Sequence, residues 1–254
     1  MLLSKNKIKY IHSLEQKKNR KAEGVFVAEG FKSVGDLLDA GYKAQMIVAT
    51  DEWEAPQSLP RDVEMYRVTD EELRKASLLL HPQQVLGVFQ IPVGSDASLE
   101  ILPSEQLCLC LDGVQDPGNL GTIIRTADWF GIRHIFCSQM TADAYNPKVV
   151  QATMGSIARV KVHYLDLKTF IKGLDADVPI YGTLLDGDDL YDAELENHGL
   201  VVMGNEGNGI SGEIREMLTS HLLIPSYPKD SDTAESLNVA IATSIICAEF
   251  RRRG

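Results

Sequence analysis

The feature that most constrains the fold is the alternation of short apolar segments with helical segments after residue 105. The apolar segments read as strands: "QLCLCLDG" (106–113), "HIFCS" (134–138), "VPIYGTLL" (178–185), "LVVMG" (200–204) and "HLLIP" (221–225). Short apolar strands separated by helices are typical of a parallel sheet that helices cover on both faces. The sequence therefore predicts an α/β domain with a mainly parallel sheet over residues 106–254.

A similar alternation in the first 92 residues predicts a second, smaller α/β domain. Its expected helices span residues 4–21, 32–41 and 70–80, and its expected strands span residues 25–30, 44–50, 64–69 and 84–91. Thr69, followed by three acidic residues, is a good signal for a helix start. Residues 93–105 lack periodicity and contain Pro, Gly and Ser, so we expect a linker there.

Composition indicates a soluble globular protein, with 44% hydrophobic and 24% charged residues. No apolar run approaches the roughly 20 residues that a membrane span needs. The first residues, "MLLSKNKIKY", become charged too early for a signal peptide. We therefore expect a cytoplasmic protein without a membrane partner. The four cysteines lack metal-ligand spacing, so buried thiols and no metal site are expected.

Charge is spread unevenly along the chain. The net charge is −11, but residues 1–21 hold seven basic side chains against one acidic one, a local charge of +6. The basic residues are Lys5, Lys7, Lys9, Lys17, Lys18, Arg20 and Lys21. A solvated helix face explains this segment as well as a surface for a phosphate backbone does.

The loop and helix after the first strand of the larger domain contain an unusual arginine. In "DPGNLGTIIR" (116–125), Pro and Gly residues precede a helix whose apolar residues recur every three or four positions. Asp116 or Asn119 could cap this helix. Arg125 lies on the opposite side from the apolar stripe, where a surface salt bridge is the ordinary role of an arginine.

Two later loops also follow predicted strands, where ligands bind in parallel α/β sheets. "LVVMGNEGNGIS" (200–211) runs from a strand into glycines that surround Glu206, which suits either a nucleotide contact or a simple turn. In the third loop, Ser236 and Asn238 precede an apolar helix ending near residue 250, and capping alone would explain Ser236.

Taken together and in this order, the three loops resemble the SpoU, or TrmH-like, family of RNA ribose methyltransferases within the SPOUT superfamily. The matching segments are "DPGNLGTIIR", "VMGNEGNGIS", and "IP" followed by "SLNVAIA". The resemblance implies a catalytic domain over residues 106–254 with a deep trefoil knot, and S-adenosylmethionine bound by the knotted loops. It also implies a homodimer in which each subunit completes the other's active site, with structured RNA, ribosomal or transfer, as the substrate.

The same resemblance implies roles for individual residues. Arg125 would be catalytic, either taking the proton of the 2′-hydroxyl or holding a phosphate or developing alkoxide. Asn119 would orient Arg125 or the ribose, and Glu206 would brace the loops or contact substrate. Ser236 and Asn238 would hold the active-site loop. The adenosine of the cofactor would lie near the residues Gly204, Ile224 and Leu237, and no metal would be required. Residues 1–92 resemble, more loosely, the family's RNA-binding domain.

One departure from the family pattern lies in the third loop. The Ile-Pro pair is separated from Ser236 by ten residues, "SYPKDSDTAE" (226–235). The family has about six residues there, including a Met and a Gly.

 The longer loop leaves an alternative of another class open, a non-catalytic RNA-binding or assembly factor that keeps the knotted fold. A base methyltransferase from another SPOUT branch is a further alternative. Asn119, Arg125, Glu206 and the run from Ser236 to Asn238 favour the ribose branch.

Overall fold

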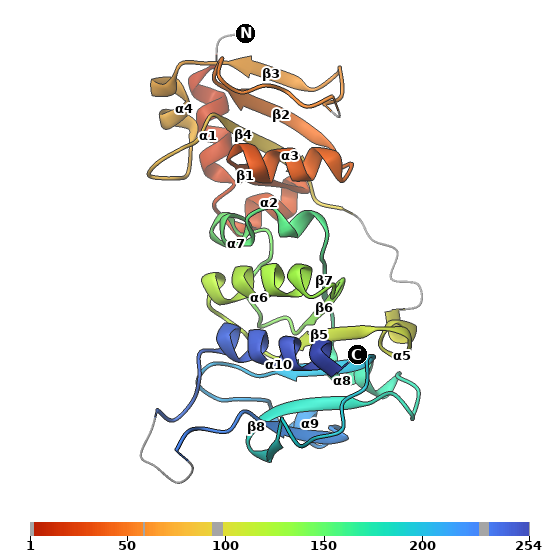
Figure 1. Cartoon of the computed structure of the whole chain (residues 1–254). Coiled ribbons are helices and arrows are strands. Elements are labelled where there is room, and N and C mark those ends of the chain that lie inside the picture. Colours follow the sequence, from red (N-terminus) through yellow and green to blue (C-terminus); the bar gives the residue numbers. More distant parts are fainter. Residues whose placement is uncertain (1–2, 58, 93–98, 229–233, 254) are drawn as a thin grey trace. The chain divides into compact units, whose positions relative to one another are not determined.

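The structure is a computed structural model, and it describes residues 3–57, 59–92, 99–228 and 234–253. The chain forms two compact units: residues 1–94 with 143–159, and residues 95–142 with 160–254. The domain division expected from the sequence assigned residues 143–159 to the C-terminal domain. In the structure this segment packs with the N-terminal residues (Figure 1). Part of the expected linker, 93–98, lies outside the described residues, and residues 99–105 are helical.

The first unit is a four-stranded sheet between helices. Its elements are α1 (Lys5–Ser13), α2 (Lys17–Glu23), β1 (Val25–Glu29), α3 (Phe31–Asp39), β2 (Ala44–Ala49), β3 (Glu64–Arg67), α4 (Asp70–Ala76), β4 (Val85–Gln90), α7 (Pro147–Thr153) and the 3-10 turn η2 (Ser156–Ala158). The strand order is β1-β4-β2-β3, and only β2 and β3 are parallel. The small α/β architecture expected from the sequence is therefore present.

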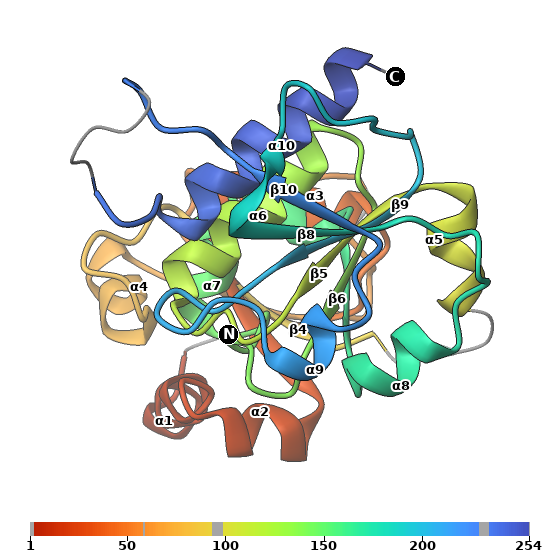
Figure 2. The same ribbon diagram turned by 90° about the horizontal axis from the view of Figure 1, so that it is seen from below.

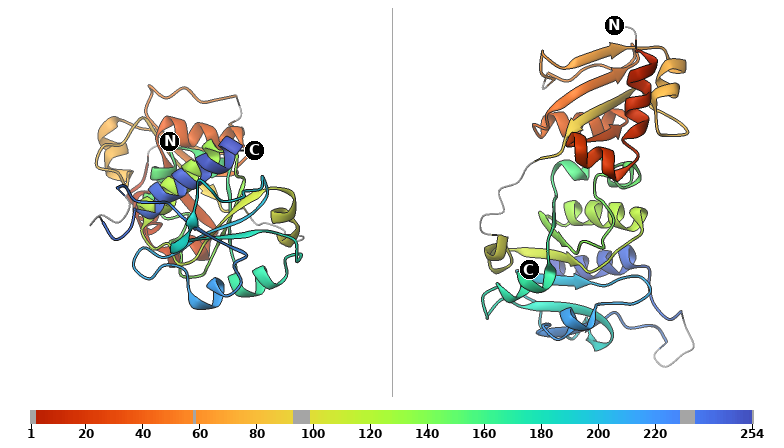
Figure 3. Two further views of the ribbon diagram at one scale, coloured as in Figure 1. Left: turned by 60° about the horizontal axis from the view of Figure 1, so that its bottom comes forward. Right: turned by 180° about the vertical axis from the view of Figure 1, so that it is seen from behind.

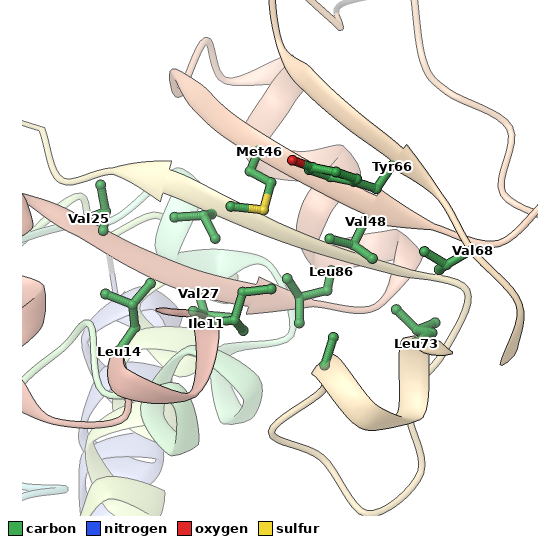
Figure 4. Close-up of a cluster of buried hydrophobic side chains, with 12 residues drawn as sticks. Ile11, Leu14, Val25, Val27, Met46, Val48, Tyr66, Val68, Leu73 and Leu86 are labelled. Carbon is green, nitrogen blue, oxygen red and sulfur yellow. The ribbon is translucent and has the colours of Figure 1, made fainter. Parts of the chain in front are cut away.

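The core of this unit lies on both faces of the sheet because successive strand residues point to opposite sides. On one face, Val25 and Val27 of β1 pack with Ile11 of α1 and Leu73 of α4 in the cluster drawn in Figure 4. On the other face, the Phe26 ring contacts the ring of Tyr145, with 4.8 Å between centroids. Burial on both faces explains why β1 reads as an unbroken apolar run.

Two helix boundaries in this unit differ from the sequence expectation. The basic segment forms two helices, α1 and α2, because the chain leaves α1 at Leu14, whose side chain is fully buried in the core. Helix α4 ends at Ala76, since Ser77 adopts an extended conformation. The expected start is confirmed: Thr69 and Glu72 form a reciprocal capping box.

Residues 143–159 are held in the first unit by a buried ion pair (green segment in Figure 3). Arg20 is only 1% exposed, and it donates hydrogen bonds to the Asp143 carboxylate at 2.6 Å and to the carbonyls of Leu14 and Glu15, each at 2.7 Å. Arg20 belongs to the basic segment, but its guanidinium is used inside the protein. The interpretation of this segment as a phosphate-binding surface therefore does not extend to Arg20.

The second unit is built on the expected parallel sheet. Its elements are η1 (Leu99–Ile101), α5 (Leu102–Glu105), β5 (Leu107–Leu111), α6 (Pro117–Trp129), β6 (His134–Cys137), β7 (Lys161–Tyr164), α8 (Leu167–Lys172), β8 (Ile180–Asp189), β9 (Gly199–Met203), α9 (Gly212–Arg215), β10 (Ser220–Leu223) and α10 (Val239–Arg253). All pairings in the order β10-β8-β9-β5-β6-β7 are parallel. The mainly parallel sheet is confirmed.

Helices cover both faces of this sheet, as Figure 2 shows: α6 and α10 lie on one face, and α5, α8 and α9 on the other. Cys108 and Cys110 of β5 point to the face of α8, where Phe170 contacts Phe136. Strand β7 is absent from the sequence expectation because it is a four-residue edge strand with partly exposed side chains and no apolar run. The first turns of α6 and α10 belong to the loops that contain the predicted site.

Candidate active site

The first loop brings the chain from β5 into α6 with the cap that the sequence suggested. The Asp116 side chain accepts a hydrogen bond from the Asn119 N–H at 2.8 Å, and Pro117 occupies the first helical position. Gly113 has a φ of 80°, which favours glycine, and it lies against the Asn205 side chain. This turn sets the Asn119 side chain at the start of the helix, beyond the end of the sheet.

Arg125 lies on the solvent face of α6. Ile123, Ile124 and Ala127 are fully buried beneath it, whereas Arg125 and Trp129 are exposed, the latter at 86%. Arg125 makes no ion pair or hydrogen bond with any residue in the described part of the chain. The ordinary role of a surface salt bridge is therefore not found among those residues, and the guanidinium is available to another group.

The second loop folds tightly at the end of β9. Asn205 and Gly209 exchange two backbone hydrogen bonds of 2.9 Å each. A Cβ atom on Gly204 would lie 2.2 Å from the carbonyl carbon of Gly209 and 2.3 Å from the nitrogen of Ile210. A side chain at residue 204 would therefore force this loop open, so the loop shape itself requires glycine there.

Asn205 and Asp112 fasten the second loop to the first, and the sequence analysis missed both. The Asn205 amide donates to the Gly113 carbonyl at 2.7 Å, and the Asp112 carboxylate accepts from the Ser211 N–H at 2.8 Å. Their positions carried a signal, since each follows the end of a buried strand within one or two residues. Polar residues there lie at the carboxyl edge of the sheet.

Glu206 accepts hydrogen bonds from the end of the first loop and from the first turn of α6. Its carboxylate binds the Asn119 amide at 3.0 Å and the N–H groups of Gln115 and Asp116 at 3.3 Å each. Partial burial alone would raise the pKa of Glu206, but these hydrogen bonds favour the charged form and lower it. The carboxylate is therefore held charged near neutral pH and braces the two loops, one of the two roles expected for it.

The third loop joins this arrangement through Asn238. Its amide donates to the side-chain oxygen of Asn119 at 2.9 Å, and its own oxygen accepts from the N–H groups of Ala240 and Ile241 at the start of α10. A continuous series of hydrogen bonds thus runs from Asn238 through Asn119 to Glu206. Side chains from all three loops meet in this series, although Asn119 and Asn238 lie 119 residues apart in the sequence.

Other predicted residues are not part of this series. Ser236 is exposed and forms no hydrogen bond within the described residues, so Asn238, and not Ser236, caps α10. The Asn119 side chain binds Glu206 and Asn238, and no hydrogen bond joins it to Arg125 in the described ranges. Of the extended third loop, residues 229–233 lie outside the described residues.

Two of the three predicted cofactor residues directly follow strands, and the third lies just before α10. Gly204 directly follows β9, Ile224 directly follows β10 and is half-buried, and Leu237 precedes Asn238 and is 50% exposed. A cavity of about 670 Å³ elsewhere in the second unit is lined by residues 188–189, 192–194 and 218–222. None of the three predicted cofactor residues lines that cavity.

The cysteines take no part in the site. All four are buried and free, as expected, and burial raises the pKa of Cys108 and of Cys247 to about 12 each. A thiol with such a pKa is protonated at neutral pH and is a poor nucleophile. Within the described residues, no group of three or more His, Cys, Asp or Glu side chains could hold a metal ion, and no helix is long and apolar enough to cross a membrane.

The three loops that meet here lie within one family match. Residues 106–248 match the model of the SpoU rRNA methylase family, and residues 5–87 match that of the MRM3-like substrate binding domain. The chain belongs to the SpoU rRNA methylase family. The resemblance that the three sequence motifs carried is confirmed.

Similar proteins span the whole chain. The 23S rRNA (guanosine(2553)-2′-O)-methyltransferase RlmP of Bacillus subtilis is 33% identical over 96% of this chain and 96% of its own length. A TrmH-family protein from Porphyromonas gingivalis is 42% identical, with full coverage of both chains and a TM-score of 0.87. An AdoMet-bound rRNA methyltransferase from Sinorhizobium meliloti is 32% identical over 100% of this chain and 97% of its own, with a TM-score of 0.85.

Proposed function

We propose that this SpoU-family chain transfers the methyl group of S-adenosylmethionine to a ribose 2′-hydroxyl in structured RNA, ribosomal or transfer. The observation that carries the proposal is the hydrogen-bonded series Asn238–Asn119–Glu206, which joins the three family motifs at the start of the helix that also carries the exposed Arg125. The similarity to RlmP, a 2′-O-methyltransferase acting on 23S rRNA, supports the same reaction class. The AdoMet-bound relative supports the cofactor.

The three predicted cofactor residues, Gly204, Ile224 and Leu237, fit this cofactor. Gly204 leaves the end of β9 without a side chain, and Ile224 and Leu237 present partly exposed apolar groups suited to the faces of an adenosine. When bound, S-adenosylmethionine supplies a methyl group on a sulfonium that is already a good leaving group. We also propose that these loops are tied in a trefoil knot, as membership of the family implies.

The protein's own contribution is placement and charge. A ribose hydroxyl is a poor nucleophile, so the reaction needs a positive group where negative charge develops. A guanidinium stays protonated at neutral pH and holds its protons too firmly to act as a base. We therefore assign Arg125 to binding the target phosphate or the developing alkoxide. Asn119, Glu206 and Asn238 are positioning residues that keep the loops together.

A homodimer would explain why Arg125 is exposed and forms no hydrogen bond with Asn119, Glu206 or Asn238 among the described residues. On α6 and α10, Trp129 and Ile241 are exposed at 86% and 52%, which are unusual values for large apolar side chains on packed helices. We propose that this face joins two copies and that Arg125 serves the site of the partner subunit. The excess of apolar residues on α10 is then buried by the second copy.

Replacing Trp129 and Ile241 together with glutamate is expected to give monomers, because two charges would be buried unpaired in the interface. Sedimentation velocity measures the result directly. The matched control is Met140→Glu, which changes an exposed apolar residue, 69% exposed, elsewhere in the same unit and should remain dimeric. A dimeric double variant would place the interface elsewhere.

The exposed lysines of the basic segment are proposed to bind RNA phosphates. Lys17, Lys18 and Lys21 of α2 are exposed, unlike Arg20 between them. Changing the three to glutamine is expected to weaken RNA binding and to reduce the slope of log K against log salt by about 0.7–0.9 for each lost contact. A control variant changes Lys43, Lys148 and Lys172, also exposed, to glutamine. Equal salt slopes of RNA binding in the two variants would indicate that the basic segment is only a solvated surface.

Methyl transfer from labelled S-adenosylmethionine to ribosomal RNA, followed by nuclease digestion and nucleoside analysis, tests the proposed function. A 2′-O-methylated nucleoside is the expected product. Calorimetry separates the alternative of a non-catalytic RNA-binding factor, since such a factor would bind RNA without binding the cofactor at millimolar concentration. A base-methylated product would instead assign the chain to the other reaction of the superfamily.

A further inference from the structure

The first unit exposes two large apolar side chains on neighbouring segments, Phe31 at 58% and Leu80 at 91%. Phe31 opens helix α3, and Leu80 lies in the loop of residues 77–84 between α4 and β4. We propose that Phe31 and Leu80 form a contact surface for unpaired RNA bases, distinct from the lysines that bind phosphates. This proposal rests on the proposed function and adds to it the kind of RNA structure that is recognised.

Backbone pairing holds the two segments together. Strands β1 and β4 are antiparallel, so the end of β1 meets the start of β4, with Glu29 opposite Leu86. Beyond this pair, the Gly30 N–H donates to the Val85 carbonyl at 2.9 Å. The Gln83 side-chain oxygen lies 3.9 Å from the position of a Cβ on Gly30. The start of α3 and the end of the loop are therefore direct neighbours.

A buried carboxylate fixes the other end of the same loop. Glu29, only 6% exposed, accepts hydrogen bonds from the Ser77 hydroxyl and from the Leu78 N–H, the latter at 2.8 Å. The Ser77 oxygen in turn accepts from the Leu79 N–H at 2.9 Å. A loop anchored at both ends to β1 has a defined shape, and this shape holds Leu80 out in solvent. Leu80 is therefore presented to solvent in a fixed position, next to the segment that carries the exposed Phe31.

The surroundings of this surface favour RNA over a protein as the partner. Helix α4 and the loop that follows it adjoin the basic helix α1. The His12 ring contacts the carbonyl of Lys75 in α4 at 3.0 Å, and Leu78 of the loop packs in the same cluster as Ile11. On α1, Lys5 and Lys9 are exposed. Figure 1 shows α1 and α4 side by side in this unit. An exposed apolar pair on a unit that also exposes the lysines of α1 matches bases and a phosphate backbone, since looped RNA offers both.

The test compares binding to two RNAs, a stem–loop and the blunt duplex made from its stem. Phe31→Ala and Leu80→Ala, together in the full-length protein, are expected to weaken binding to the stem–loop about tenfold or more, as the loss of base stacking predicts. Duplex binding and the salt slope should stay unchanged, because no phosphate contact is lost. The matched control, Ile101→Ala with Met140→Ala, removes two exposed apolar residues of the second unit and should bind as the wild type does.

Several outcomes would overturn the proposal. Unchanged affinity for the stem–loop, an equal loss on the duplex, or no binding of the stem–loop by the wild type would each do so. Phe31→Trp, which keeps an aromatic face, should retain stem–loop binding, whereas a merely structural role would not distinguish Trp from Ala in this way. Methyl transfer by the wild type to ribosomal RNA is measured separately. If that transfer occurs while the Phe31 and Leu80 variant binds normally, the surface is wrong and the proposed function stands.

Discussion

Arg125→Ala is expected to lower kcat for methyl transfer by about 10²–10³-fold or more, the usual cost of removing a donor from developing negative charge. Arg125 is exposed and has no partner among the described residues of its own subunit, so its removal leaves no buried charge and should not unfold the protein. Single-turnover kinetics with saturating RNA and cofactor measure the chemical step. Calorimetry should show nearly unchanged cofactor affinity.

The matched control is Arg133→Ala, since Arg133 follows the same helix but is paired with Asp128 at 3.2 Å. This variant should keep close to wild-type activity. Mixed dimers sharpen the result: Arg125→Ala subunits combined with Glu206→Ala subunits should regain activity if Arg125 serves the partner's site. Full activity of the Arg125→Ala protein would remove Arg125 from the mechanism. If the Arg125→Ala and Glu206→Ala proteins are each inactive and their mixed dimers are inactive too, Arg125 belongs to the site of its own subunit.

Arg20→Ala is expected to destabilise the first unit by about 3 kcal/mol or more, because it leaves the partly buried Asp143 carboxylate without its cation. It also removes the hydrogen bonds to the carbonyls of Leu14 and Glu15 at the end of α1. The two tryptophans allow each unit to be followed separately, since Trp53 lies in the first unit and Trp129 in the second. Urea unfolding of a Trp129→Phe background, monitored by Trp53 fluorescence, reports the first unit alone.

The control for this variant is Lys17→Ala on the same helix, where an exposed side chain is lost and the change should stay within about 0.5 kcal/mol. An Arg20→Ala protein as stable as this control would contradict a structural role for the ion pair. Because Arg20 is buried, its variants would also mislead an RNA-binding study. Weaker binding by Arg20→Ala would then report a disturbed fold and not a lost phosphate contact.

Sequence periodicity was sufficient for the larger features of the fold. The apolar strands β5 and β9 are buried on both faces, which is why they read as continuous runs and indicated a parallel sheet. The edge strand β7 gave no such signal, because its side chains are partly exposed. The membership of residues 143–159 in the first unit depends on Arg20 and Asp143, which lie 123 residues apart. No local pattern encodes a contact of that kind.

The sequence predicted which residues form the site, but not which side chains form hydrogen bonds with one another. The motifs named Asn119, Glu206 and Asn238, whereas the order in which their side chains bind one another follows from the turn geometry at Gly113 and Gly204. Capping was assigned to Ser236 from residue type alone, although Asn238 stands one position before α10 and can reach its free N–H groups. Residue type alone therefore did not decide between two good capping residues separated by one leucine.

The chemical identity of the product formed by the purified wild-type protein decides most directly whether this chain is a ribose methyltransferase. Ribosomal RNA transcribed without modifications and labelled S-adenosylmethionine are incubated with the protein, and the digested RNA is separated by mass spectrometry. We expect a single 2′-O-methylated nucleoside that is absent with Arg125→Ala and present with Arg133→Ala. A label on a base, or no label in RNA that the protein binds together with the cofactor, would contradict it.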